Sequence, residues 1–202
     1  RELKFVRGDY FSEMALQRAN VKEAMKVLIL ADTLESSAVS EVDSKTVMTV
    51  LTIKSMAKDV YVTAEVLDRK YESYLKEAMC DEILFSREFS KRMIANSSAT
   101  NGISHIISEL LSRESSNSRL TTESISPEYI NKTYGEYREL FSDSSDHILL
   151  GIMENSGTPI KMKIEALREA QKTSDVSKLV SNLQKVKGLE VNKPIFLPAD
   201  DY

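Results

Sequence analysis

Short apolar runs alternate with amphipathic stretches through the first 87 residues of the chain. The runs are four to six residues long, which is the length of buried strands, and the stretches between them have the three- and four-residue spacing of helices. This alternation predicts an α/β fold in which a parallel sheet is wrapped by helices. We expect strands over Leu3–Asp9, Val27–Asp32, Val60–Val66 and Asp81–Phe85.

Helices are predicted between and after these strands. The apolar positions of Val42–Met56 and Asp68–Met79 recur at helical spacing. A longer helical stretch, Phe89–Leu111, is interrupted near Asn101-Gly102, and its second half has an apolar stripe. The sequence after this stretch is polar and rich in serine, so Ser112–Ser126 is predicted to be a linker.

The C-terminal part has the pattern of a second, smaller lobe. Thr133–Phe141 predicts a short helix and His147–Met153 a strand. Two amphipathic helices are predicted within 161–190, because two apolar stripes flank a break and cap at Thr173-Ser174-Asp175. The expected organisation is an incomplete N-terminal lobe (1–88), a crossing helix with linker (89–126) and a C-terminal lobe (127–202).

The order of several short motifs resembles the second half of an RCK domain, the regulator of potassium conductance. The resemblance implies a partial Rossmann-like sheet, a helical connector and a small α+β C-terminal lobe. The insertion over 161–190 departs from the family pattern. The motifs are Gly8-Asp9, Arg18-Ala19-Asn20-Val21, Asp32, Ala64-Glu65, Cys80-Asp81-Glu82-Ile83, Asn101-Gly102, Thr133–Phe141, Ile148–Ile152 and Pro194–Asp201.

The family's first strand–helix–strand unit, with its glycine-rich turn, has no counterpart in this sequence, and no G-x-G-x-x-G occurs. A half sheet would leave an apolar edge open to pairing. We therefore expect the missing half to be supplied in some form, either upstream or by another chain.

Acidic residues at predicted strand ends are the candidate ligand site. The resemblance implies that Asp32 and Glu65 bind a divalent cation such as calcium, which needs several oxygen ligands. Leu67 stands where the family would favour another acid; Asp68 or Glu35 could compensate. Alternatively, Asp32 caps its own loop and Glu65 pairs with a nearby base.

A nucleotide is the second ligand considered. The resemblance places Gly8 and Asp9 beside an adenosine moiety in nucleotide-binding relatives, with Asp32 nearby. Gly8 and Asp9 could equally form a simple corner between a strand and a helix. Asp9, Asp32 and Glu65 together would form an effector site, because parallel sheets bind ligands at the carboxyl ends of their strands.

The apolar stripe at the end of the long helical stretch is a candidate dimer interface. It could instead close the lobe's own core. The resemblance favours contact with a partner chain, because the corresponding helix–turn–helix of the family crosses to a second subunit. The stripe consists of Ile103, Ile106, Ile107 and Leu110.

Composition restricts the function further. A net charge of −4 argues against nonspecific nucleic-acid binding, and no apolar stretch is long enough for a membrane span. Cys80 is the only cysteine, which excludes an intrachain disulfide and suits a reducing cytosol; we expect it to be buried and inert. No catalytic triad or carboxylate pair with a substrate context is present, so no enzyme activity is expected.

The resemblance implies a cytoplasmic regulatory domain at the inner face of the cell membrane. Its copies would form dimers and then a ring, and ligand binding would bias the pore domain of a potassium channel. Two alternatives stay open: a nucleotide-binding subunit of a potassium uptake transporter, and a dinucleotide-dependent oxidoreductase. Each would need the glycine-rich turn upstream.

Overall fold

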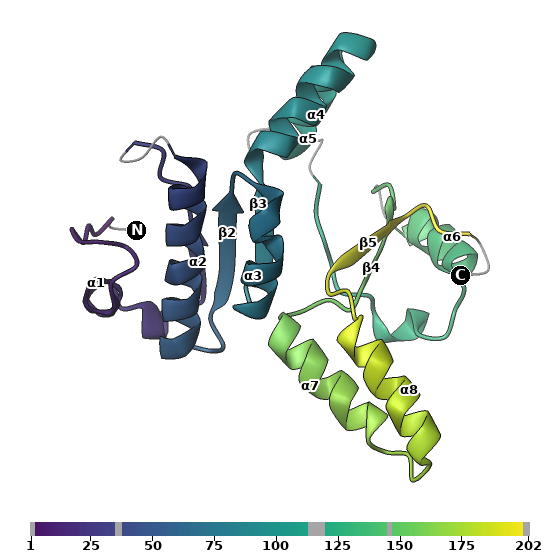
Figure 1. Ribbon diagram of the computed structural model, residues 1–202. Coiled ribbons are helices and arrows are strands. Elements are labelled where there is room, and N and C mark those ends of the chain that lie inside the picture. Colours follow the sequence, from purple (N-terminus) through teal and green to yellow (C-terminus); the bar gives the residue numbers. More distant parts are fainter. Residues whose placement is uncertain (1–2, 35–37, 113–119, 145–146, 200–202) are drawn as a thin grey trace. The chain divides into compact units, whose positions relative to one another are not determined.

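Three parallel strands form the centre of the N-terminal part of the chain in the computed structural model (Figure 1). Their order is β1-β2-β3, with Ile29 opposite Ala64 and Ala64 opposite Ile83. Helices connect successive strands, so the predicted α/β class with a parallel sheet is confirmed. The bounds are β1 Lys26–Ile29, α2 Val39–Met56, β2 Tyr61–Val66, α3 Glu72–Glu77 and β3 Glu82–Phe85.

The structure describes residues 3–34, 38–112, 120–144 and 147–199. The chain divides into an N-terminal unit, Arg1–Ile107 with Thr158–Ile160, and a C-terminal unit, Ser108–Gly157 with Lys161–Tyr202. The two units are described separately below.

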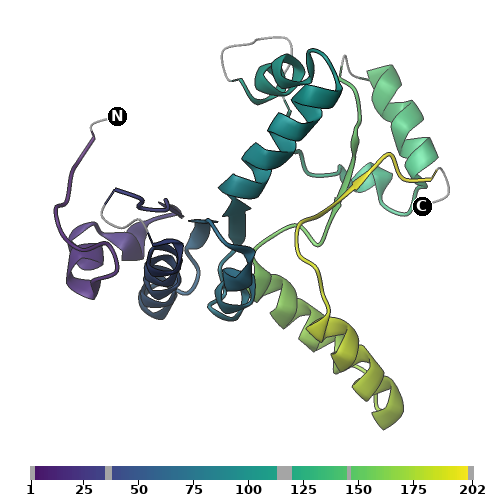
Figure 2. The ribbon, with the colours of Figure 1, turned by 45° about the horizontal axis from the view of Figure 1, so that its top comes forward.

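One face of the parallel sheet holds the core of the N-terminal unit. Alternate residues of β2 (Val62, Ala64 and Val66) are fully buried there, as the period of two in a strand requires. They pack in one cluster with Val50 and Ile53 of α2. Figure 2 shows α2 and α3 on the same side of the strands. Burial of this apolar face is the main force that holds the lobe together.

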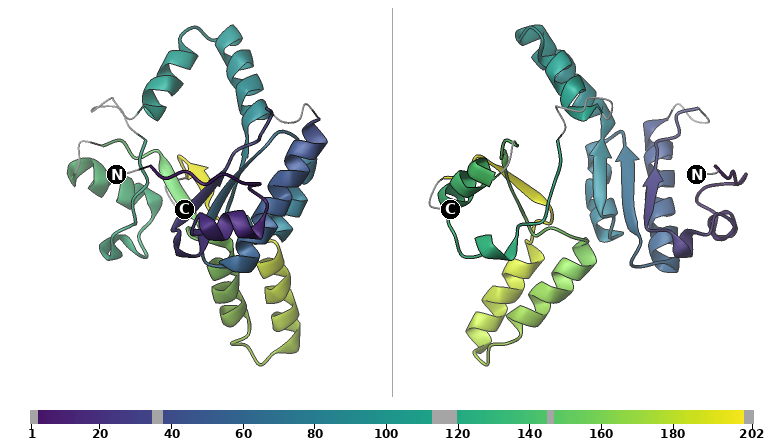
Figure 3. Two further views of the ribbon diagram at one scale, coloured as in Figure 1. Left: turned by 90° about the vertical axis from the view of Figure 1, so that its left-hand side faces the viewer. Right: turned by 180° about the vertical axis from the view of Figure 1, so that it is seen from behind.

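The other face of the sheet is open within this unit. Leu28 of β1 and Leu84 of β3 are exposed, and Tyr61 and Thr63 of β2 are half-buried. In the right panel of Figure 3 the strands lie in front of α2 and α3. Only one layer of helices therefore covers the sheet in the described part of the unit.

The predicted strand over Leu3–Asp9 is wrong. These residues lie outside the sheet, which ends at β1 in the described residues, and Phe5 is 91% exposed. An apolar run becomes a strand only when its amides and carbonyls meet a neighbouring strand, and the sequence pattern does not report that partner. A short helix, α1 (Glu13–Arg18), follows and leads through the 3-10 turn Val21–Glu23 into β1.

The predicted interruption of the long helical stretch is confirmed. Helix α4 spans Ser86–Ala99 and α5 spans Ile103–Leu111. Gly102 between them has a φ of +83°, which a residue with a Cβ rarely adopts. The break therefore lets the chain change direction between two helices.

Helix α6 (Tyr134–Ser144) begins the regular part of the C-terminal unit after the 3-10 turn Pro127–Tyr129. Its start is a capping box, because Glu136 accepts a hydrogen bond of 2.9 Å from the Thr133 amide and the Thr133 hydroxyl accepts one of 3.3 Å from the Glu136 amide. The hydrogen bonds that the Thr133 amide and hydroxyl donate to the Glu136 carboxylate lower the pKa of Glu136. They fix where the helix begins.

A two-stranded antiparallel ribbon follows α6. Strand β4 (Gly151–Glu154) pairs with β5 (Lys193–Phe196), and Gly151 lies so close to β5 that a Cβ there would meet the Ile195 carbonyl oxygen at 2.1 Å. The strand predicted over His147–Met153 is therefore shorter at its start, because pairing with β5 begins at Gly151.

The two helices predicted within 161–190 are present as α7 (Pro159–Ala170) and α8 (Val176–Lys187). Asp175 caps α8 by accepting a 2.9 Å hydrogen bond from the Ser177 amide. The two helices run antiparallel beside each other (Figures 1 and 3).

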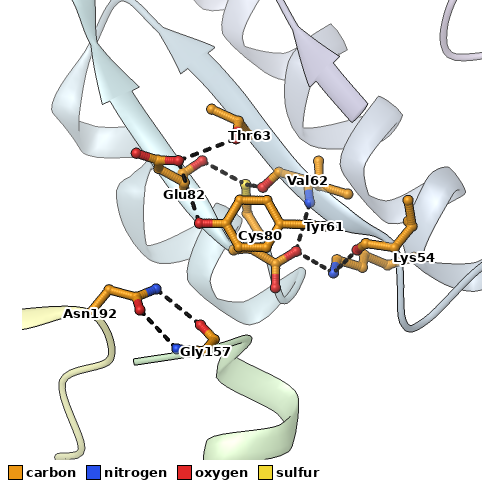
Figure 4. A network of polar contacts seen from close by, with 10 residues as sticks. Lys54, Tyr61, Val62, Thr63, Cys80, Glu82, Gly157 and Asn192 are labelled. Carbon is orange, nitrogen blue, oxygen red and sulfur yellow. Dashed lines mark hydrogen bonds and ion pairs between the residues drawn. The ribbon is translucent and has the colours of Figure 1, made fainter. Parts of the chain in front are cut away.

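The ends of this helical hairpin are joined where the chain leaves β4 and returns to β5. The Asn192 amide group accepts a 2.9 Å hydrogen bond from the Gly157 N–H and donates one of 3.0 Å to the Gly157 carbonyl (Figure 4). Asn155 donates a further 2.9 Å bond to the Glu190 carbonyl. The hairpin is thus attached to the ribbon at both ends.

Candidate functional site

Glu65 joins the carboxyl ends of β1 and β2. Its Oε2 atom accepts a hydrogen bond of 3.0 Å from the backbone amide of Ala31, just beyond the last residue of β1. Glu65 is half-buried and precedes Val66, the last residue of β2. A carboxylate therefore lies at the edge of the sheet where parallel sheets bind ligands.

Asp32 belongs to the loop that follows β1. Its Oδ1 atom accepts a 3.0 Å hydrogen bond from the amide of Leu34, as in an Asx turn. This contact fits the interpretation that Asp32 caps its own loop. Glu65, in contrast, contacts a backbone amide rather than a basic side chain. Asp32 and Glu65 come from neighbouring strand ends, and Glu65 is bonded to the residue that precedes Asp32.

Asp43 supports the same edge of the sheet from α2, a role that was not predicted from the sequence. Its side chain is fully buried near the start of that helix. Its two carboxylate oxygens accept hydrogen bonds of 2.9 Å each from the amides of Leu67 and Asp68. A carboxylate with two amide donors is well satisfied, so it ties the loop after β2 to α2. The signal was present in the sequence, because Asp43 shares its helix face with the buried Thr46 and Val50.

Asp68, in the loop after β2, is one of the two acids that could compensate for the leucine at position 67. Asp68 caps the 3-10 turn Arg69–Tyr71 by accepting a 3.0 Å hydrogen bond from the Lys70 amide. The Lys70 ammonium lies 3.1 Å from the second carboxylate oxygen. These hydrogen bonds lower the pKa of Asp68. Glu35, the other candidate, lies outside the described residues.

Gly8 and Asp9 form a corner that leads into α1. A Cβ at Gly8 would approach the Cβ of Ala15 to 3.0 Å, so the absence of a side chain allows the close packing. The carbonyl of Asp9 accepts a 2.9 Å hydrogen bond from the Ser12 amide, while its side chain is exposed. Within the described ranges, no three Asp, Glu, His or Cys side chains lie close enough together to hold a metal ion.

A buried ion pair lies at the opposite edge of the sheet (Figure 4). The Lys54 ammonium lies 2.6 Å from Asp81 Oδ2, and the two side chains are 8% and 0% exposed. Lys54 also donates a 2.8 Å hydrogen bond to the Val60 carbonyl, and Asp81 accepts one of 2.7 Å from the Val62 amide. These contacts join α2, β2 and the start of β3, and they are part of the scaffold rather than of the candidate site.

Cys80 belongs to this scaffold. It is buried, and its single S–H lies within hydrogen-bonding distance of two carbonyl oxygens, those of Val62 at 3.5 Å and Glu82 at 3.2 Å. Burial raises its pKa to about 11. The predicted burial of Cys80 is confirmed, and a thiol with a raised pKa is protonated at neutral pH; that it is inert stays a prediction.

A shallow groove of about 500 Å³ lies between α2 and α3. It is lined mainly by the apolar and aromatic side chains of Met48, Tyr71 and Tyr74, with Lys70 at its border. None of the side chains that line the groove is acidic.

Helix α5 has an apolar face that is largely uncovered. Ile106 is 57% exposed, Leu110 is also exposed, and Ile103 and Ile107 are half-buried. Among the described residues of the chain, no helix is long and apolar enough to cross a membrane.

Comparison with known proteins finds a similarity within the N-terminal unit. Residues 1–64 match the calcium-activated potassium channel slowpoke-like RCK domain. Over these residues the chain is similar to an RCK domain. The match includes Gly8, Asp9 and Asp32 and ends one residue before Glu65.

Two potassium channels are similar to the chain over part of its length. The calcium-gated potassium channel TvoK of Thermoplasma volcanium is 34% identical over 110 residues, which is 54% of this chain and 31% of that protein. The putative potassium channel protein YugO of Bacillus subtilis is 31% identical over 88 residues, 44% of this chain and 26% of that protein. The chain thus spans about a third or less of the length of these relatives.

The fold resembles that of a solved structure, the human SLO3 gating ring. The TM-score is 0.55 at 19% sequence identity, with 74% of this chain and 31% of that chain covered. At this identity the likeness concerns the fold. It extends beyond the 64 residues that match the RCK domain by sequence.

Proposed function

We propose that this chain is a cytoplasmic regulatory domain of a potassium channel, in which ligand binding at the carboxyl ends of the strands changes the association of subunits and so biases a pore. The observation that carries the proposal is the RCK domain match together with two carboxylates, Asp32 and Glu65, at neighbouring strand ends. The role is binding and mechanical coupling rather than catalysis.

Calcium is the ligand that this arrangement favours. The TvoK relative is described as calcium-gated. Asp32 and Glu65 each use one carboxylate oxygen for a backbone amide, which leaves lone pairs for a cation. Calcium takes six to eight oxygens at about 2.3–2.6 Å, so backbone carbonyls and water would complete its shell. Leu67 supplies no carboxylate, and we therefore expect weak affinity.

The apolar face of α5 is the proposed dimer contact. Ile103, Ile106, Ile107 and Leu110 share one side of the helix and would be covered by a second copy. Dimers would then build a ring, the form named for the SLO3 relative. A ligand that binds one arrangement of the copies more tightly shifts the equilibrium toward it, and a tethered pore would follow.

Calorimetric titration of the purified chain tests the ligand. We expect calcium to release or absorb heat, with magnesium and adenine nucleotides weaker or silent, and Asp32→Asn to abolish the calcium signal. Asp59→Asn is the matched control, because this exposed residue carries the same charge at the opposite edge of the sheet. Silence toward calcium, or an equal loss in both variants, would refute calcium binding at this site; nucleotide heat alone would favour the nucleotide site around Gly8 and Asp9.

Light scattering tests the dimer. Replacing Ile106 and Leu110 together with Asp should yield monomers, because charges on a buried apolar face are costly. Ser108→Asp places a charge on the opposite side of α5 and should leave the mass unchanged. A monomeric wild type, or an unchanged mass of the double variant, would count against this interface.

A further inference from the structure

The charges of the C-terminal unit are strongly divided along the sequence. Residues 159–188, which contain α7 and α8, carry seven Lys or Arg and three Asp or Glu, a net charge of +4. Residues 121–158, which contain α6, carry two basic and seven acidic residues, a net charge of −5. The chain as a whole has a charge of only −4, so this division is local.

The α7–α8 hairpin also carries an uncovered apolar surface. We call the side of each helix that holds its less exposed residues the inner side. In α7 this side contains Ala170, which is buried, and Ala166, which is half-buried. Leu167 lies about a quarter turn further round the helix and Ile164 more than a third of a turn, and both are exposed. The apolar stripe of α7 therefore does not face inward.

Helix α8 repeats this arrangement. Its half-buried residues Leu179 and Val186 mark the inner side, while Val176 and Val180 are 73% and 51% exposed about a quarter turn further round. Because the helices are antiparallel and both stripes are displaced in the same sense, the stripes lie on one side of the hairpin. We call this side the hairpin face. It consists of Ile164, Leu167, Val176, Val180 and Leu183.

Basic side chains border the hairpin face. Lys161 and Arg168 flank the stripe on α7, and Lys187 lies beside it on α8. The acids Glu165 and Glu169 are on the far side of α7. Among the described residues, no salt bridge joins Lys161, Arg168 or Lys187 to an acid within the chain. A partner for this face should therefore be acidic with an apolar contact at its centre.

Helix α6 has these properties. Glu136, Glu139 and Asp143 recur at three- and four-residue spacing and form an acidic ridge on its exposed side. Leu140 lies next to this ridge and is exposed. The ridge is complementary to the hairpin face in both charge and apolar character.

We propose that the hairpin face of one copy of the chain binds the acidic ridge of α6 on a second copy. Such a contact uses two different surfaces of the same chain and is therefore head-to-tail, the kind of interface that generates a ring when its rotation closes. Two hairpin faces, each bordered by basic side chains on a segment with a net charge of +4, would repel each other, so a symmetric hairpin pair is disfavoured. The inference rests on the proposed assembly of copies and supplies a contact separate from that of α5.

Disulfide cross-linking of the full chain tests the pairing. Chains carrying Leu140→Cys and Leu167→Cys are mixed under mild oxidation; the native Cys80 is buried and does not interfere. We expect the mixed L140C–L167C pair to exceed either homodimer by about tenfold at low salt, and to weaken as salt screens the charges. Ser181→Cys, on the other side of α8 from the stripe, is the positional control and should cross-link little to L140C.

Charge exchange supplies the specificity test. Lys161→Glu with Arg168→Glu in the L167C chain should abolish the cross-link, and Glu139→Lys with Asp143→Lys in the L140C chain should restore it. Lys178→Glu with Lys185→Glu makes the same change of charge on the far side of α8 and should leave most of the cross-link intact. Failure of the charge exchange to restore the link, or a dominant L167C homodimer, would overturn the proposal.

Two further outcomes distinguish this contact from binding to a lipid surface and from a failure of the regulatory function as a whole. The wild type is also sedimented with vesicles of phosphatidylglycerol and phosphatidylcholine. If it binds the vesicles, if Lys161→Glu with Arg168→Glu abolishes this binding, and if no L140C–L167C link forms, then the hairpin face binds an anionic lipid surface and not a second copy of the chain. The same samples are measured for calcium heat and for the α5-dependent dimer. If those persist while the link fails, the hairpin contact alone is wrong; if all three fail, the regulatory function fails as well.

Discussion

The Glu65 carboxylate accepts a hydrogen bond of 3.0 Å from the backbone amide of Ala31 and so links the carboxyl ends of β2 and β1. A side chain of one strand thus holds the loop that follows the neighbouring strand. The same carboxylate is a proposed cation ligand. A substitution can separate the structural role from the ligand role, because the hydrogen bond from the Ala31 amide needs only an acceptor oxygen, whereas cation binding needs a negatively charged carboxylate.

The first prediction separates these two roles of Glu65. Glu65→Gln keeps an acceptor for the Ala31 amide and should leave the free energy of unfolding nearly unchanged, while Glu65→Ala should lower it by about 1 kcal/mol. Both variants should lose the calorimetric response to calcium. Urea unfolding with parallel titration measures both effects. A Gln variant as unstable as the Ala variant would show that the charge itself is structural.

Asp43 should be the most sensitive acid in α2. Asp43→Ala leaves the amides of Leu67 and Asp68 without their acceptors, and we expect a loss of about 2 kcal/mol or more in unfolding free energy. Asp59→Ala removes an exposed carboxylate and should change stability by less than about 0.5 kcal/mol. Chemical denaturation of both variants decides the matter; equal effects would mean that the Asp43 contacts contribute little.

The buried ion pair predicts a non-additive double variant. Lys54→Met leaves the fully buried Asp81 carboxylate uncompensated and should cost about 3 kcal/mol. Adding Asp81→Asn removes the charge but keeps an acceptor for the Val62 amide, so the double variant should be more stable than Lys54→Met alone. Thermal unfolding of both variants is the measurement, and a double variant less stable than the single one would contradict the assignment.

Cys80 predicts how stability changes at alkaline pH. Its folded pKa of about 11 is raised above the ordinary value of 9.0 by burial. The folded state therefore holds the thiol proton more tightly, and the resulting stability is present below pH 9 and is lost as the pH rises toward 11. Cys80→Ala should flatten this decline in urea midpoints, and iodoacetamide should label the native thiol slowly at pH 7. Fast labelling of folded protein would contradict the burial.

The sequence predicted the elements whose pattern is local. Strands β1, β2 and β3 were identified because apolar runs of strand length are separated by helical periodicity, and α7 and α8 because two stripes flank a capped break. Leu3–Asp9 has the same apolar character but is not a strand, since strand formation depends on a partner that no local pattern reveals.

The candidate site was predicted only in part. Glu65 lies at the end of β2 and Asp32 follows β1, as expected from the positions of the acids relative to the apolar runs. The roles of Asp43, Lys54 and Asp81 were not predicted, because their partners are backbone groups and side chains far away in the sequence. A polar residue in the apolar phase of a helix, such as Asp43 or Lys54 in α2, is the sequence signal that such a partner exists.

Sedimentation velocity of the purified chain in calcium and in EGTA tests the central claim most directly, because it asks whether ligand binding changes the association of copies. We predict that the wild type self-associates and that calcium shifts its distribution of sedimentation coefficients, whereas Asp32→Asn associates but does not respond to calcium. A distribution that is the same with and without calcium, in a wild type that binds calcium in titration, would contradict the coupling of ligand binding to assembly.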